Sequence, residues 1–131
     1  METGCYETEI EVRFADLDAY GHVNNAVFFT YMEIARTKLL RDKFIAWQKR
    51  DLLFLVVRAE CDYQQPITFS DRVFVSLEID RIGRSSFDLT YRLHNGAGRD
   101  FATARTVMVC FDAGAGTTVP VPDEFCQALM P

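Results

Sequence analysis

The chain has 131 residues, of which 49% are hydrophobic and 25% charged, and these values predict one globular domain over 1–131. They exclude an intrinsically disordered protein, and the lack of any run of about 20 apolar residues argues against a membrane span. The net charge of −5 argues against a nucleic-acid partner.

The cysteines and the first residues bear on metal binding and location. The four cysteines form no Cys-x-x-Cys pair and only two histidines are available, so no structural zinc site is expected. The segment METGCYETEIEVRF lacks the basic start and apolar stretch of a signal peptide. A cytoplasmic protein with reduced cysteines is therefore expected.

The first third of the chain predicts a strand, a loop and a long helix. Apolar and polar residues alternate over 6–14, which is typical of a strand with one wet face. A polar loop follows over 15–23. Asn24 and Asn25 are favourable N-cap residues, and apolar residues at helical spacing predict a helix from about residue 25 to about residue 44.

The rest of the chain favours strands, which the alternation places at 52–63, 72–81, 86–93 and 101–111. Asn95-Gly96 predicts a hairpin between the last two, and 122–129 is interpreted as a final helical turn. One helix followed by such a meander indicates an α+β protein with a five-stranded antiparallel sheet. The exposed edges of this sheet favour dimerisation through an edge strand.

The segment 13–25 is the most informative for chemistry, because a loop with two carboxylates and a histidine directly precedes a helix N-terminus. Free N–H groups and the positive end of the helix dipole can stabilise an oxyanion. A nearby carboxylate can act as a nucleophile or as a base for water. This combination suits acyl transfer to water.

Each of these residues also has an ordinary structural explanation. Asp16 and Asp18 can cap or be solvated, and His22 can belong to a turn. Glu33 is expected to pair with Arg36, three positions further along the helix surface. The residues alone therefore leave the function open.

The block Asp16-Leu17-Asp18-Ala19-Tyr20-Gly21-His22-Val23-Asn24-Asn25, with the helix residues 28–36 after it, resembles the signature of the hotdog-fold thioesterases. The branch is the one typified by 4-hydroxybenzoyl-CoA thioesterase, and weaker matches continue through Asp62-Tyr63, Pro66, Asp71 and 82–86. The resemblance implies a hotdog fold, in which a five-stranded antiparallel sheet wraps around one long central helix. It further implies a homodimer or homotetramer that hydrolyses an acyl thioester at the dimer interface.

The resemblance also implies roles for residues. Asp18 falls on the catalytic carboxylate, and the backbone N–H that polarises the carbonyl falls near Asn25. His-Val-Asn-Asn is also similar to the loop of plant acyl-carrier-protein thioesterases, which makes His22 an orienting or water-binding partner and leaves the acyl carrier open. Tyr20 and Phe28 are expected beside the acyl group, with Phe29 and Met32 in the core.

For the carrier, the resemblance implies coenzyme A as part of the substrate, with Arg84, Ser85 and Ser86 as phosphate contacts. No metal or redox cofactor is expected. Two alternatives remain. One is a hotdog hydratase or dehydratase on acyl thioesters, although its motif is absent from the sequence. The other is a non-catalytic dimer that binds acyl thioesters.

Overall fold

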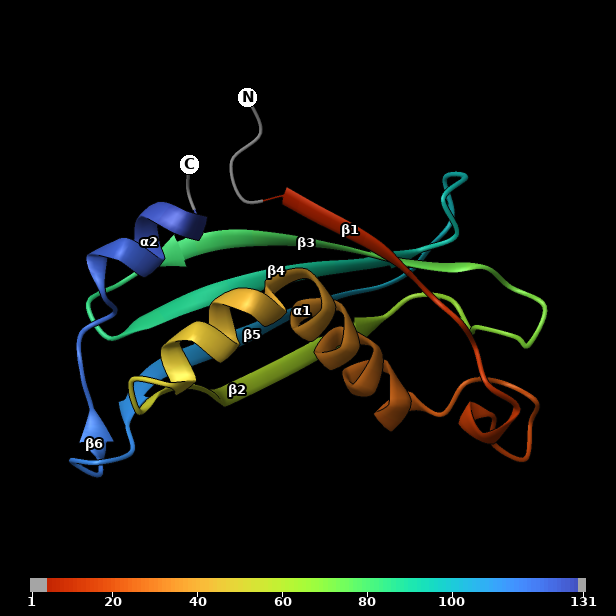
Figure 1. Cartoon of the computed structure of the whole chain (residues 1–131). Helices are drawn as coiled ribbons and strands as arrows, with labels where there is room; N and C mark the ends of the chain where they lie inside the picture. The colour runs from red at the N-terminus through yellow and green to blue at the C-terminus, as the bar shows by residue number, and fades with distance from the viewer. Residues whose placement is uncertain (1–4, 130–131) are drawn as a thin grey trace.

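Five long strands pair into one antiparallel sheet in the order β1-β3-β4-β5-β2 in the computed structural model, which describes residues 5–129 (Figure 1). Their bounds are β1 Cys5–Ile10, β2 Leu52–Tyr63, β3 Val73–Ile82, β4 Ser86–His94 and β5 Asp100–Asp112. A two-residue strand, β6 (Thr117–Thr118), adds to β5. The sheet wraps around one long helix, α1 (Asn25–Gln48), so the expected α+β hotdog architecture is confirmed.

Alternation along the strands places the core between the sheet and α1. The inward residues of β3 and β4 are buried, as the sequence pattern predicts (Val73, Val75, Leu77, Ile79, Phe87, Leu89, Tyr91 and Leu93). The buried residues of α1 meet them (Phe28, Tyr31, Met32, Ala35, Leu40 and Trp47). Among residues 5–129, no helix has the length and apolar character needed to cross a membrane.

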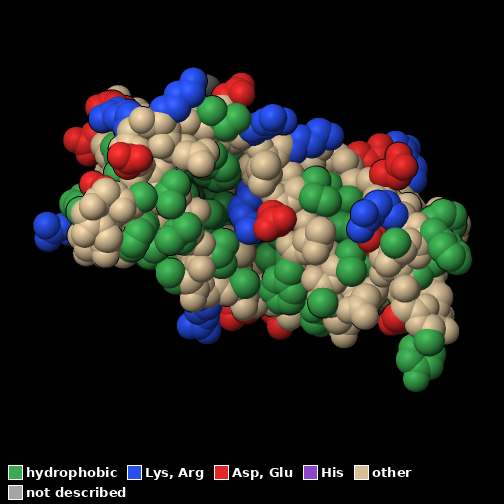
Figure 2. All heavy atoms as spheres, turned by 60° about the horizontal axis from the view of Figure 1, so that its bottom comes forward, with side chains coloured by type: hydrophobic (Ala, Val, Ile, Leu, Met, Phe, Trp, Pro, Cys, Tyr) green, Lys and Arg blue, Asp and Glu red, His purple; other side chains and the backbone are tan. Residues whose placement is uncertain are grey.

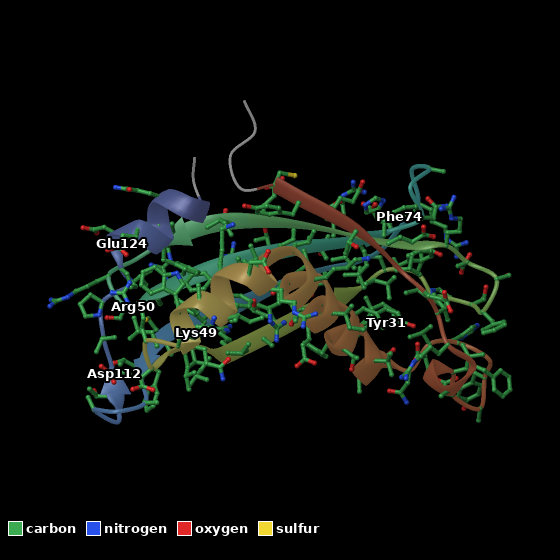
Figure 3. All side chains as sticks on the ribbon, viewed as in Figure 1. Tyr31, Lys49, Arg50, Phe74, Asp112 and Glu124 are labelled. Carbon is green, nitrogen blue, oxygen red and sulfur yellow. The ribbon has the colours of Figure 1, made fainter. Side chains whose placement is uncertain are left out.

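The helix extends four residues beyond its expected end near residue 44, and an aromatic contact explains the extra turn. Trp47 is buried and packs edge-to-face on Phe125, at 6.3 Å between ring centroids. Phe125 belongs to α2 (Asp123–Leu129), the helical turn expected at the end of the chain. Arg50 lies over the Trp47 ring and forms an ion pair with Glu124, which ties the two helices together (Figure 3).

The first strand ends at Ile10 rather than at residue 14, because the chain turns into a short 3-10 helix, η1 (Phe14–Asp16). The Asp16 carboxylate accepts hydrogen bonds from the backbone and side chain of Arg13, which closes this turn. Phe14, expected on the core face of a strand, is instead 80% exposed. Local side-chain hydrogen bonding overrides the alternating pattern here.

β2 is one of the two edge strands of the sheet, and its exposed surface is apolar. Leu55, Val56 and Val57 are between 39% and 61% exposed, and the register shifts between Val56 and Arg58. An open, apolar edge strand can add a further strand from another chain. Figure 2, which brings the bottom of Figure 1 forward, shows hydrophobic side chains spread across this face.

Candidate active site

The loop before α1 is folded into a tight turn. Asp18 N–H donates to the His22 carbonyl at 2.8 Å, and Gly21 N–H donates to the Asp18 carbonyl at 3.0 Å. Gly21 has φ +76°, a conformation that favours glycine. Val23 N–H donates to the Ile67 carbonyl at 2.8 Å, which ties the turn to the segment before β3.

Asp16 is the buried carboxylate of this loop. It is 2% exposed and accepts bonds from Arg13 and, at 2.7 Å, from the hydroxyl of Tyr31 in the first half of α1 (Figure 3). Burial acts to raise the pKa of Asp16, but the hydrogen bonds from Arg13 and Tyr31 outweigh it and lower the pKa. Asp16 therefore holds the loop against the helix.

Asp18 is the open carboxylate of the same loop. Its Oδ1 accepts hydrogen bonds from the backbone N–H groups of Tyr20 at 2.9 Å and His22 at 3.4 Å. Within residues 5–129, no hydrogen bond engages its Oδ2. Asp18 lines a pocket of about 230 Å³ together with His22, Asn25 and Phe28. A fixed carboxylate with one free oxygen at a pocket can act as a base or nucleophile.

The N-terminus of α1 opens onto this pocket. Asn24 is the N-cap, and its side-chain oxygen accepts from Ala26 N–H at 2.9 Å. Asn25 is the first helical residue, so no carbonyl within the helix can accept from its backbone N–H. This donor and the positive helix end suit a developing oxyanion.

Tyr63, at the end of β2, is a pocket residue without an assigned role in the sequence-based prediction. Its hydroxyl donates to the Asn25 carbonyl at 2.8 Å, and its ring packs edge-to-face on Phe28 at 4.9 Å between centroids. Tyr31 was missed as well, although a tyrosine in the apolar stripe of a helix needs a hydrogen-bond partner and so signals one. Tyr31 fixes the helix relative to the loop, and Tyr63 fixes the start of the helix relative to β2.

The structure brings together only some of the predicted site residues. Asp18, His22, Asn25 and Phe28 share the pocket, whereas Tyr20 is 85% exposed on the tip of the turn. Met32 is fully buried in the core, and Phe29 is half-buried beside it.

The predicted phosphate contacts, Arg84, Ser85 and Ser86, lie at the other end of the molecule. The carbonyls of Arg84 and Ser85 accept from Val121 and Cys110, close to α2. The 24 residues of α1, about 36 Å of helix, separate this end from Asp18. One chain alone therefore does not place both groups in a single site.

The expected ion pair between Glu33 and Arg36 is wrong, since it is absent from the ion pairs of residues 5–129. Arg36 instead lies beside the buried hydroxyl of Tyr91. The guanidinium of Arg36 therefore contacts the sheet, since Tyr91 belongs to β4.

Comparison with known proteins gives a consistent result. A family model described as the thioesterase-like superfamily matches residues 12–129. The long-chain acyl-CoA thioesterase FadM of Escherichia coli is 30% identical over 126 residues, covering 94% of this chain and 96% of that protein. A 1,4-dihydroxy-2-naphthoyl-CoA hydrolase of Synechococcus elongatus is 30% identical over 126 residues, covering 91% and 90%.

A solved structure shares the architecture. The crystal structure of a thioesterase from Thermus thermophilus, complexed with coenzyme A and Zn, superimposes with a TM-score of 0.83 at 34% identity. The match covers 97% of this chain and 92% of that one.

Proposed function

Since this chain belongs to the thioesterase-like superfamily and is a thioester hydrolase, we propose that it cleaves acyl-coenzyme A with Asp18 as the catalytic carboxylate. The observation that carries the proposal is the free Oδ2 of Asp18 in a pocket at the N-terminus of α1. The buried Asp16, whose oxygens are occupied by Arg13 and Tyr31, is not available for this role.

In the proposed reaction, Asp18 removes a proton from a water that attacks the thioester carbonyl, or attacks the carbonyl itself. The negative charge that develops on the carbonyl oxygen is held by the N–H of Asn25 and the helix end. The carbon–sulfur bond breaks, coenzyme A leaves as the thiolate, and a proton from water restores the thiol. The carboxylate and the amide supply the attacker and the oxyanion donor, so the proposal needs no metal or redox cofactor.

His22 is proposed to orient the attacking water. Its main chain is fixed on both sides by Asp18, through the N–H at 3.4 Å and the carbonyl at 2.8 Å. The side chain is half-buried and lines the same pocket. An imidazole ring that lines this pocket can hydrogen-bond a water beside the Asp18 carboxylate.

We further propose that two chains form the complete site. Asp18 lies at one end of α1 and the Arg84–Ser86 turn at the other, and a single bound substrate must reach both. Pairing of two β2 edges in antiparallel fashion would bring the turn of one chain toward the pocket of the other. The dimer can pair further into a tetramer. Tyr20, which is exposed in the single chain, is free to cover the acyl group. A cytoplasmic location stays a prediction.

The test is release of free thiol from a panel of short, long and aromatic acyl-CoAs and of acyl-carrier-protein thioesters. Asp18→Asn keeps the shape and should lower kcat by about 10³-fold, because the base or nucleophile is lost. Asp42→Asn, a matched change of an exposed helix carboxylate, should retain the wild-type rate. Full activity in Asp18→Asn contradicts the role of Asp18.

The same assay separates the alternatives. A hydratase or dehydratase transforms the acyl group but releases no thiol, and a binding dimer retains the thioester intact. Thiol release from none of the substrates overturns the proposed function.

A further inference from the structure

A groove of about 350 Å³ runs between α1 and β2, beyond the pocket that contains Asp18. Apolar side chains form most of its walls (Phe29, Met32, Val56 and Ala59). Its polar lining residues are Thr30, Glu33, Arg36 and Thr106. Figure 2 shows hydrophobic side chains gathered on the face that is turned forward in that view.

The groove follows the Asp18 pocket along α1, because Phe28 lines the pocket and the next residue, Phe29, lines the groove. The two elements run in opposite directions, because Tyr63 contacts Asn25 at the start of α1 and Phe54 packs on Phe44 near its end. The groove lies between these two contacts. Arg36 is eleven positions after Asn25, which corresponds to about 16 Å along the helix. An acyl group attached at the pocket can extend along the groove toward Arg36.

The buried hydroxyl of Thr106 lines the groove, and the buried hydroxyl of Tyr91 lies next to it. Thr106 is 1% exposed and Tyr91 is 3% exposed, and their oxygens are 2.7 Å apart. Burial raises the pKa of Tyr91, while the Thr106 hydroxyl and the Arg36 guanidinium beside it act in the opposite direction. The hydroxyl pair and the guanidinium therefore form one polar cluster in apolar surroundings.

Arg36 is half-buried, and no carboxylate of residues 5–129 lies within ion-pair distance of it. Glu33, on the same groove, is exposed and does not pair with it. A guanidinium carries only donors, so its remaining N–H groups need an acceptor oxygen. A purely hydrocarbon ligand in this groove would remove water from those donors and replace it with nothing.

From these contacts we propose that Arg36, with Thr106, selects an acyl group that carries an acceptor oxygen remote from the thioester. The inference rests on the proposed thioester hydrolysis and adds the class of acyl group that this chain prefers. The oxygen belongs to a carboxylate or to a hydroxyl, and a carboxylate would form the stronger, bidentate contact. A polar group in a pocket discriminates more strongly than added apolar contact, because a mismatched ligand leaves it unpaired.

The experiment compares kcat/KM for three thioesters of equal length: dodecanoyl-CoA, its ω-hydroxy derivative and the mono-CoA thioester of dodecanedioic acid. The wild type should prefer an oxygen-bearing substrate over dodecanoyl-CoA by about tenfold. The derivative with the higher kcat/KM shows whether the preferred acyl group carries a hydroxyl or a carboxylate. The preference for an oxygen-bearing acyl group should be absent for the mono-CoA thioester of butanedioic acid, because this chain is too short to reach Arg36.

Arg36→Met removes the donors and keeps the length of the side chain, so it should reduce the preference to about one. Arg36→Lys keeps the charge without the planar fork and should retain part of it. Arg41→Met, a matched change of an exposed arginine on the same helix outside the groove, should keep the wild-type preference. Thermal unfolding of each variant checks that it is folded.

The outcomes separate this inference from the proposed function. Hydrolysis of dodecanoyl-CoA without any preference, or a preference that survives in folded Arg36→Met, overturns this inference and leaves thioester hydrolysis standing. Hydrolysis of none of the three substrates, while another thioester of the panel is cleaved, overturns this inference alone. Thiol release from no substrate of the panel overturns both.

Discussion

Asp16 and Asp18 lie two residues apart on one loop, yet their carboxylates have opposite surroundings. Asp16 is 2% exposed, and both of its oxygens accept hydrogen bonds from Arg13 or Tyr31. Asp18 uses only Oδ1 in the turn, and its side chain lines the pocket. The saturated carboxylate fixes the loop, and this fixed loop lets its neighbour keep an oxygen for chemistry.

The largest difference is expected in folding stability when each carboxylate becomes an amide. Asp16→Asn places an amide group against the donors of Arg13 and Tyr31, and the free energy of unfolding should fall by about 3 kcal/mol. Asp18→Asn can still accept both backbone N–H groups through Oδ1, so its change should stay within about 0.5 kcal/mol. Urea unfolding at pH 7 measures both. Similar losses in the two variants would remove the distinction between a structural and a free carboxylate.

A smaller effect is expected when one donor to Asp16 is deleted. Tyr31→Phe removes the 2.7 Å hydrogen bond and leaves the ring packed, so the free energy of unfolding should fall by about 1.5 kcal/mol. Tyr20→Phe, which loses the hydroxyl of an exposed tyrosine on the same loop, serves as the control and should be neutral. The comparison is by urea midpoint. No loss in Tyr31→Phe would mean that Arg13 alone satisfies Asp16.

The smallest effect is expected in how folding stability changes as the pH falls. The pKa of folded Asp16 is lowered from a usual value of about 3.9, so the unfolded chain binds the proton more readily. The stabilisation by ionised Asp16 is therefore complete above about pH 5 and is lost as the pH falls through the lowered pKa. The stability gap between wild type and Asp16→Asn should narrow below about pH 4. A gap that is constant from pH 3 to pH 7 would contradict the lowered pKa.

The strands and the helix were predictable from the sequence because burial of one face makes apolar residues recur at a regular spacing. The same pattern failed at Phe14, where alternation continues but the hydrogen bonds between Asp16 and Arg13 turn the chain. It also failed after residue 44, because Trp47 is held by Phe125 from the distant α2. Contacts between residues far apart in sequence leave no such period.

The candidate site was predictable to a different degree. Asp18 could be preferred over Asp16 only through the family resemblance, since both are loop aspartates before a helix. The partner of Asp16, Tyr31, is fifteen residues away, and Tyr63 reaches Asn25 across thirty-eight residues. Pairings of this kind are set by the tertiary structure rather than by local spacing. The absence of the predicted Glu33–Arg36 ion pair has the same origin, because Tyr91 of the sheet lies beside Arg36.

The separation of Asp18 from the Arg84–Ser86 turn has a genetic consequence for the proposed two-chain site. A mutation at Asp18 would damage one part of each two-chain site, and a mutation in the Arg84–Ser86 turn would damage the other part. Two mutant alleles, one altered at Asp18 and the other at the turn, would therefore complement each other in a mixed dimer. One of its two sites would combine the intact ends of both chains, and activity would return although neither allele alone encodes it.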